Sequence, residues 1–463
     1  MVETRPLIAH IGLEMHEFRK AVAALREQGW VPAILQSELE FLRLAGVDQD
    51  MPLRSAQKPR GGPHAGSGEL FFRGEGLYYC VASGAGDPAF EIGLISKNAA
   101  DIDKRVRSFA SAVEMAVRRS VDGPKVRGKT FEWTKPKPDR SRLAALVDTE
   151  TQDEGARFAT LPHDRELATG VAAAAEPLAR EILADLVLAG FSRTRDILAG
   201  RRSEAKEARS ALDKLRRAGL ITLEHLLECR KYGTPLTRLT DPGKLQTAEV
   251  AELVCPSCGA RFSEENVCEG FSASELGRRL SRNAHWLTVL MMHELFELGV
   301  PGDFMVWNTS QPDEGVDVAV EFLGRFWTFE LKEGKFGAGD VLGFNRRRER
   351  YRPQKAFAVS AERISPDAKR LFEELPSEQM PVCLSGLGKV TEALRREVHA
   401  ASLGYACGRL QVIEDVTGYD VGRVVAARFE EKAPVRRPRP DPAAEPEATA
   451  ADMAAGLQQA PQK

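Results

Sequence analysis

Three charged residues, Asp317, Glu330 and Lys332, lie in two neighbouring apolar runs of the chain. If the runs pair as a hairpin, Asp317 lies opposite Glu330, and Lys332 shares their face because side chains alternate along a strand. Carboxylates held about 5 Å apart repel each other unless a cation lies between them, and Mg²⁺ prefers such oxygens. An amine beside the ion can position a water or stabilise charge on a phosphate. The three residues therefore predict metal-dependent phosphodiester hydrolysis.

The hairpin follows from the pattern of the two runs, residues 315–322 and 325–332. The pair Leu323 and Gly324 between them predicts a two-residue turn, whereas a bulge at Gly324 would change the register. The turn makes large apolar residues face each other on one side, as burial requires: Val320 faces Trp327, and Val318 faces Phe329.

Asp317 followed by Glu330-Leu-Lys332 in an α/β pattern resembles the PD-(D/E)XK restriction-endonuclease-like superfamily over about residues 272–390. The resemblance implies that Asp317 and Glu330 bind Mg²⁺, that Leu331 adds a backbone carbonyl, and that Lys332 is catalytic. It implies a metal-dependent nuclease with an α/β core. An inactivated nuclease fold and an ordinary salt-bridged hairpin remain the alternatives.

Other residues fit the same family pattern less well. The pair Pro312-Asp313 offers a literal Pro-Asp, but it precedes the apolar run, so Asp317 is favoured. The family often places a further acid on its first helix, which we expect over residues 274–298 with an interruption, and Glu294 and Glu297 are candidates. His285, near the start of that helix, is expected to be packed rather than catalytic.

A basic run follows the motif and predicts contact with nucleic acid, DNA being favoured. Such residues can neutralise phosphates, although a solvated helix face is the plainer interpretation. The candidate contacts are Arg346, Arg347, Arg348, Arg350, Tyr351 and Arg352.

Four cysteines lie within forty residues of one another. Cys255-Pro-Ser-Cys258-Gly259 has the form of a zinc knuckle, in which two thiolates reach one tetrahedral ion. Cys229-Arg-Lys-Tyr232-Gly233 has the same layout with a tyrosine at the second ligand position, and is similar to a degraded knuckle of the zinc-ribbon family. Cys268 is the expected fourth ligand. The prediction is structural Zn²⁺, with a metal-free knuckle as the alternative.

Residues 175–233 show three closely spaced helical patterns followed by strand-like residues, which resembles the winged helix-turn-helix family. In that family the third helix enters the major groove. Basic residues exceed acidic ones by 11 to 6 between Arg193 and Lys231. The resemblance implies nucleic-acid contact by the third helix through Arg209, Arg216 and Arg217, although many winged helices bind proteins instead.

Length and composition bound these interpretations. The chain has 463 residues, 43% of them apolar and 29% charged, with 65 basic against 67 acidic residues. This composition excludes collagen-like, disulfide-scaffold and wholly disordered classes, and any basic surface must be local. The apolar stretches fall short of the ~20 residues that span a bilayer, and the start lacks a signal layout, so a cytoplasmic protein is expected.

The expected organisation is a multidomain α+β and α/β chain. An α+β domain of unassigned role over residues 1–135 is a candidate surface for a homodimer or a complex partner. The remaining expected parts are a linker over 136–172, a winged helix over 173–235, a zinc-ribbon-like segment over 236–271, a restriction-endonuclease-like α/β core with a mixed sheet over 272–425, and a disordered tail over 433–463.

Two functional classes remain open. One is a Mg²⁺-dependent endonuclease that docks its substrate through the winged helix and zinc ribbon. The other is a non-enzymatic DNA-binding regulator, or a subunit of a restriction, defence or transposition complex, with an inactive nuclease-like scaffold.

Overall fold

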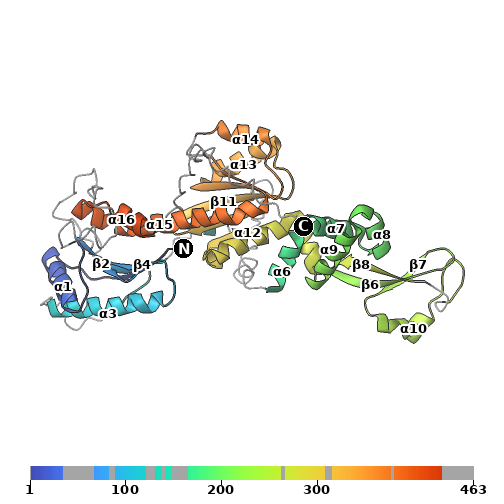
Figure 1. Ribbon diagram of the computed structural model, residues 1–463, viewed down its shortest axis with the longest axis horizontal. Helices are drawn as coiled ribbons and strands as arrows, with labels where there is room; N and C mark the ends of the chain where they lie inside the picture. Colours follow the sequence, from blue (N-terminus) through green and yellow to red (C-terminus); the bar gives the residue numbers. More distant parts are fainter. Residues whose placement is uncertain are drawn as a thin grey trace, which may run out of the picture.

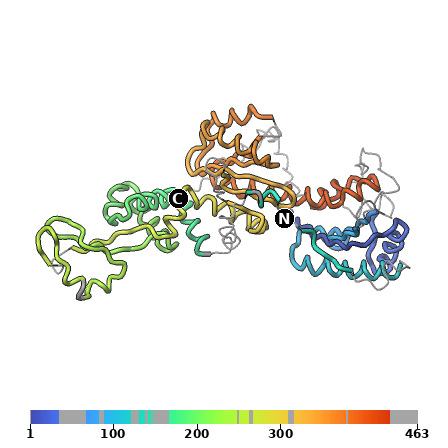
Figure 2. Tube along the Cα trace, turned by 180° about the vertical axis from the view of Figure 1, so that it is seen from behind, coloured from blue at the N-terminus to red at the C-terminus, as the bar shows by residue number. Residues whose placement is uncertain are grey.

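The computed structural model describes residues 2–34, 67–82, 89–120, 131–137, 141–146, 165–261, 266–307, 315–376 and 380–429. These residues form an elongated molecule of three lobes, each with its own sheet (Figure 1). The view from behind shows the same order of lobes (Figure 2). The expected tail over 433–463 and the pair Pro312-Asp313 lie outside the described residues.

The N-terminal lobe is an antiparallel sheet with helices on both faces. Its strand order is β1 (Glu3–Ala9), β4 (Phe90–Ser96), β3 (Gly76–Ala82) and β2 (Ser67–Arg73). Helices α1 (Met15–Glu27) and α3 (Ile102–Ser120) cover one face, where Phe18, Phe71 and Phe109 are buried.

Helix α15 (Val390–Thr417) joins the N-terminal and central lobes, as both views show (Figures 1 and 2). Its first half buries Leu394 in the central core, and its second half packs Ile413 on the N-terminal sheet together with α16 (Val421–Phe429). A Cβ at Gly68 of β2 would lie 2.4 Å from Ile413, so the packing needs glycine there. The fold that begins within residues 1–135 is therefore completed by helices from the far end of the chain.

The third lobe combines helices with a four-stranded sheet. Its main helices pack around one core that contains Leu183, Leu212 and Leu215. The expected linker over 136–172 contains helix in its described parts, because apolar residues such as Leu143 and Leu167 are buried there. The helices of this lobe are α6 (Arg165–Ala174), α7 (Pro177–Ala189), α8 (Thr194–Ala199) and α9 (Ala205–Arg217). Helix α4 (Ser141–Leu146) precedes them and packs on the central lobe.

The sheet of this lobe has the strand order β5-β8-β6-β7. Strand β8 pairs along the whole of β6, so the expected boundary at residue 235 falls inside this lobe. Residues 229–265 are consequently an insertion between two paired strands. The elements are β5 (Ser192–Arg193), β6 (Ile221–Glu228), β7 (Pro235–Leu239), α10 (Ala248–Ala251) and β8 (Asn266–Ala273).

The central lobe is a mixed five-stranded sheet, antiparallel from β9 to β11 and parallel from β11 to β13. Helices α12 and α15 cover one face, and α13 and α14 cover the other. The elements are α11 (Glu275–Ser281), α12 (His285–Glu297), β9 (Met305–Trp307), β10 (Val318–Phe322), β11 (Arg325–Lys332), α13 (Ala338–Tyr351), β12 (Lys355–Ser360), α14 (Pro366–Glu373) and β13 (Val382–Ser385).

The predicted hairpin register between β10 and β11 is confirmed. Val318 pairs with Phe329 and Val320 with Trp327. Leu323 and Gly324 both have positive φ, 53° and 73°, which a two-residue turn of the primed type requires. The turn fixes which face each later residue of β11 occupies.

The interruption expected in the helix over 274–298 is confirmed. Asn283 and Ala284 adopt left-handed backbone angles between α11 and α12. At the start of α12, His285 is buried and stacks on Trp307, with ring centroids 4.3 Å apart.

Within the described residues, no helix is both long and apolar enough to cross a membrane.

Candidate functional site

The first charged residue of the predicted site, Asp317, directly precedes β10 at the end of the hairpin. Its Oδ2 accepts a hydrogen bond of 2.6 Å from the backbone N–H of Leu331. Within one strand residue, the N–H and the carbonyl point to the same neighbouring strand. The Leu331 carbonyl therefore also points to the side on which Asp317 lies. The sheet thus brings the carboxylate of Asp317 and the backbone of Leu331 together.

Glu330 lies on the sheet face that α13 covers. Its carboxylate accepts two hydrogen bonds from one edge of the Arg347 guanidinium: Nε donates to Oε2 at 2.8 Å, and a terminal nitrogen donates to Oε1. Both side chains are about four-fifths buried. Arg347 was expected to contact nucleic acid; α13 instead turns this arginine towards the sheet.

Lys332 shares the face of Glu330, and its Nζ is paired with Asp340 in the first turn of α13. Asp340 also accepts a hydrogen bond of 2.7 Å from the Gly337 N–H at the beginning of the helix. Asp340 is not among the residues predicted from the sequence. An acid three residues after the glycine that precedes a helix is a capping pattern that could have located it.

These five side chains, Asp317, Glu330, Lys332, Asp340 and Arg347, are called the carboxylate site below. Burial raises the pKa of Asp317, and the Leu331 N–H and Arg347 lower it by less. Burial also raises the pKa of Glu330, against the opposing effect of Arg347, and the charges of Asp317 and Asp340 add to the rise. Three acids share two basic partners, so the site favours additional positive charge.

Asp340 behaves differently from the other two acids. Burial raises its pKa, but the hydrogen bonds from Lys332 and from the Gly337 N–H outweigh burial, and the net pKa is lowered. Asp340 is therefore ionised at neutral pH and holds the Lys332 amine beside the sheet.

The remaining acids proposed from the family pattern lie further along α12. Arg180 of α7 stacks over Trp286 and also pairs with Glu333, the residue after Lys332, at 2.7 Å. Through Arg180, the beginning of α12 is therefore linked to this end of β11. Glu294 and Glu297 follow Trp286 by about 12 and 16 Å of helix.

The basic run after the motif divides between several environments. Arg346, Arg350 and Arg352 are exposed, Arg348 is half-buried, and Arg350 lies over the ring of Tyr351. Tyr351 packs against the cluster around Phe326. Arg348 and Arg352 line a cavity of about 510 Å³ with Lys355, at the start of β12. This cavity lies at the opposite end of β12 from Ser360, which pairs with Lys332.

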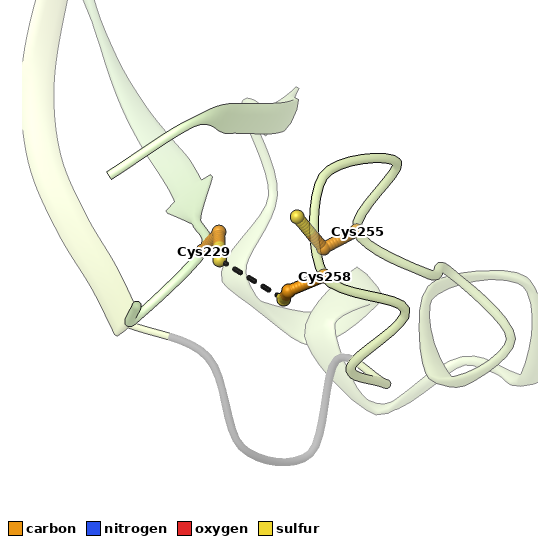
Figure 3. Close-up of side chains that lie close together, drawn as sticks. All are labelled: Cys229, Cys255 and Cys258. Carbon is orange, nitrogen blue, oxygen red and sulfur yellow. Dashed lines mark hydrogen bonds between the residues drawn. The ribbon is translucent and has the colours of Figure 1, made fainter. Parts of the chain in front are cut away.

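A second group of possible ligands lies at the insertion of the third lobe. The Sγ atoms of Cys229, Cys255 and Cys258 all lie within 4.8 Å of one another, and those of Cys229 and Cys258 are 3.5 Å apart. Cys229 follows the end of β6, and the other two belong to one loop (Figure 3). Tetrahedral thiolates on one Zn²⁺ are about 3.8 Å apart. This group, called the thiol cluster below, could bind a metal ion such as zinc.

The two predicted knuckles share one backbone form. The Gly233 N–H donates to the Cys229 carbonyl at 2.7 Å, and the Gly259 N–H donates to the Cys255 carbonyl at 2.9 Å. Both glycines have positive φ. The knuckle that contains Tyr232 therefore keeps its turn, and Tyr232 itself is exposed.

Within the cluster, Cys255 differs from its neighbours. Burial raises the pKa of the Cys255 thiol, but hydrogen bonds from the Ser257 N–H and from neighbouring groups outweigh burial and lower it. A lowered thiol pKa favours the thiolate form that binds metals.

The expected fourth ligand, Cys268, lies outside the thiol cluster. Cys268 is opposite Leu226 in the sheet, and its thiol donates to Glu228 at 3.6 Å. Cys229 follows Glu228 directly, so strand alternation directs the two cysteines to opposite faces. This physical reason corrects the expectation that Cys268 completes the ligand set.

The arginines predicted to contact nucleic acid on the third helix are exposed. Arg209, Arg216 and Arg217 project from α9, whose other face buries Leu212 and Leu215 in the core of the lobe. The same core is bordered by Leu331 and Trp307 of the central lobe, so α9 belongs to a lobe that packs beside the carboxylate site.

Comparison with known proteins assigns no family, since no family model, no curated protein and no solved structure matches the chain.

Proposed function

We propose that the chain is a divalent-metal-dependent nuclease that hydrolyses phosphodiester bonds, with DNA as the favoured substrate. The observation that carries the proposal is that Asp317 and Glu330 lie close enough at one end of a mixed sheet for the charge of Asp317 to act on Glu330. The Leu331 N–H donates to Asp317 there, and Lys332 follows Glu330 by two residues on the same strand face. The element order around them supports the resemblance to the PD-(D/E)XK superfamily.

The donor set fits Mg²⁺. The side chains of Asp317 and Glu330 and the carbonyl of Leu331 are all hard oxygen ligands, and the Leu331 N–H already orients Asp317. An excess of acids over bases at the carboxylate site also fits a cation. When bound, Mg²⁺ supplies charge neutralisation and activation of water.

The chain's own residues then have separate roles. Asp317 and Glu330 hold the cation, and the sheet fixes their spacing. Lys332 presents its amine on the same face, where it stabilises negative charge on a phosphate or positions the attacking water. Asp340 pairs with that amine and so orients it beside the sheet.

Substrate docking is assigned to the third lobe. Its order of helix, short strand, two helices and paired strands supports the resemblance to a winged helix, and Arg209, Arg216 and Arg217 lie on the exposed side of α9. The ion pair between Arg180 and Glu333 connects this lobe to the residue next to Lys332. This contact places the lobe beside the end of β11, as docking of a duplex near the carboxylate site would require.

The thiol cluster is assigned to a structural Zn²⁺. Soft thiolates select zinc over Mg²⁺, and three sulfurs within 4.8 Å support tetrahedral coordination. The ion would join the end of β6 to the loop of Cys255 and Cys258, and so fix the insertion against its sheet.

A second candidate function is a non-enzymatic nucleic-acid-binding protein, or a subunit of a larger restriction, defence or transposition complex. The observation that favours it is that α13 supplies partners to both Glu330 and Lys332. A purely structural hairpin would be stabilised by the same ion pairs.

The discriminating experiment is incubation of the full chain with supercoiled plasmid, with Mg²⁺ or with EDTA. The nuclease predicts Mg²⁺-dependent nicked or linear product. A footprint on DNA without any cutting would support the second candidate and contradict the first.

A further inference from the structure

Helix α13 crosses the sheet so that two of its residues face two residues of β11. Asp340 and Arg347 are seven residues apart, which is about two turns, and so lie on one side of the helix. They pair with Lys332 and Glu330, which are two residues apart on one face of the strand. This helix therefore contributes one partner of opposite charge to each side chain.

The contact with Glu330 involves both carboxylate oxygens. Arg347 donates from Nε to Oε2 at 2.8 Å and from a terminal nitrogen to Oε1. A metal ion at Glu330 would lie beside the guanidinium that already engages both oxygens, so the two positive charges compete for one carboxylate. Asp317 is engaged differently, because one oxygen receives a backbone N–H that a metal does not displace.

Gly343 provides the space for this arginine. A Cβ built at Gly343, one turn before Arg347, would lie 3.3 Å from a terminal nitrogen of the guanidinium. A Cβ at Gly339, in the same helix, meets nothing within 4 Å. The guanidinium therefore lies back along α13 over a glycine, and a methyl group at residue 343 would press on it.

We propose that Arg347 is the counter-ion of Glu330 in the metal-free protein, and that a divalent cation binds the carboxylate site by displacing the guanidinium. The inference rests on the proposed function, because it assumes that Glu330 is a metal ligand. Arg347 is then a positioning residue that sets the metal concentration at which the site becomes active.

The test is a calorimetric titration of the full chain with Mg²⁺ at pH 8, comparing wild type with Arg347→Met and with Arg346→Met as the matched control. Mg²⁺ is the probe because thiolates bind it poorly, so the thiol cluster does not contribute heat. Loss of the competing charge should lower the Kd of Arg347→Met by about tenfold, whereas Arg346→Met should keep the wild-type Kd.

A gentler variant keeps the inference testable if Arg347→Met folds poorly. Gly343→Ala crowds the guanidinium and should lower the Kd by about twofold to threefold, while Gly339→Ala should not change it. Both alanines favour helix, so neither should reduce folding.

The outcomes distinguish failure of the counter-ion role of Arg347 from failure of the proposed Mg²⁺ site. An equal or higher Kd in Arg347→Met and in Gly343→Ala, with Mg²⁺ binding intact in wild type, would overturn the counter-ion role and leave the proposed function standing. No Mg²⁺ heat in any of the proteins would overturn both.

Discussion

The thiol cluster and the carboxylate site hold their donor atoms in different ways. In the thiol cluster three sulfur atoms face one another within 4.8 Å. In the carboxylate site the side chains of Glu330 and Lys332 face partners of opposite charge on α13. The sulfur atoms are already gathered as a metal would need them, whereas at the carboxylate site a metal would compete with the existing ion pairs.

If the two sites bind metals as proposed, this contrast predicts how firmly each site holds its ion. Soft thiolates fixed by two glycine-containing turns need little rearrangement, which favours tight, permanent binding of a structural ion. Carboxylates that already have a cationic partner bind a hard ion more weakly, since binding must first break that pairing. Weak, exchangeable binding suits a catalytic ion.

The largest expected effect concerns the thiol cluster. Cys255→Ser should abolish binding of the proposed zinc ion and remove a stabilisation on the order of 10 kcal/mol, so the insertion should become accessible to protease. Cys268→Ser is the matched control and should retain one zinc per chain in a colorimetric metal assay. Equal zinc loss in the two variants would return Cys268 to the ligand set.

The next largest effect concerns catalysis at the carboxylate site. Lys332→Ala should reduce the rate of Mg²⁺-dependent plasmid cleavage roughly 10²–10⁴-fold and leave DNA affinity unchanged, because the amine acts on the reacting phosphate. Lys335→Ala, an exposed lysine three residues away, serves as the control. A Lys332→Ala protein that cuts as fast as this control would make the ion pair with Asp340 purely structural.

A smaller expected effect is the pH dependence of stability that comes from His285, in the apolar surroundings on the α12 side of the central sheet. Burial lowers the pKa of His285 to about 4, below the value near 6.5 of an unfolded chain. Between pH 6.5 and pH 4, His285 is therefore protonated in the unfolded state but not in the folded state. Its contribution to the free energy of unfolding is present above pH 6.5 and is lost as the pH falls towards 4.

The free energy of unfolding should fall by about 2 kcal/mol between pH 7 and pH 5 because of His285, and His285→Phe should remove this part of the pH dependence. Urea unfolding followed by tryptophan fluorescence measures it, since His285 stacks on Trp307. The same pH dependence in wild type and variant would mean that His285 is protonated in the folded protein.

The smallest effect concerns docking by the lobe that contains the thiol cluster. Replacing Arg209 and Arg217 by alanine should weaken DNA binding about tenfold and reduce the slope of log K against log salt by about 2, from two lost phosphate contacts. The control replaces Arg19 and Arg26, exposed on α1 of the N-terminal lobe. An unaltered slope in the α9 variant would remove this helix from the interface.

The sequence could predict those parts of the fold that local patterns determine. The β10–β11 register followed from alternation and a two-residue turn, and both knuckle turns followed from the spacing of cysteine and glycine. The packing of Ile413 on Gly68 could not be predicted, because no local pattern links residues so far apart.

The same limit applies to the two sites. The place of Asp317, Glu330 and Lys332 depends on one hairpin, but the approach of Asp340 and Arg347 depends on how α13 crosses the sheet. Cys268 was assigned by closeness in sequence, and strand alternation between β6 and β8 separated it from Cys229. Residue type identifies candidate chemistry, and tertiary packing decides the partners.

Calorimetric titration of wild type and Asp317→Ala with Mg²⁺ shows whether Asp317 and Glu330 form the proposed Mg²⁺ site. We expect heat from a saturable site in wild type and none in the variant, although the variant should keep its zinc and its unfolding midpoint. Equal heats in the two proteins, or no heat in wild type, would mean that these two carboxylates do not form a Mg²⁺ site.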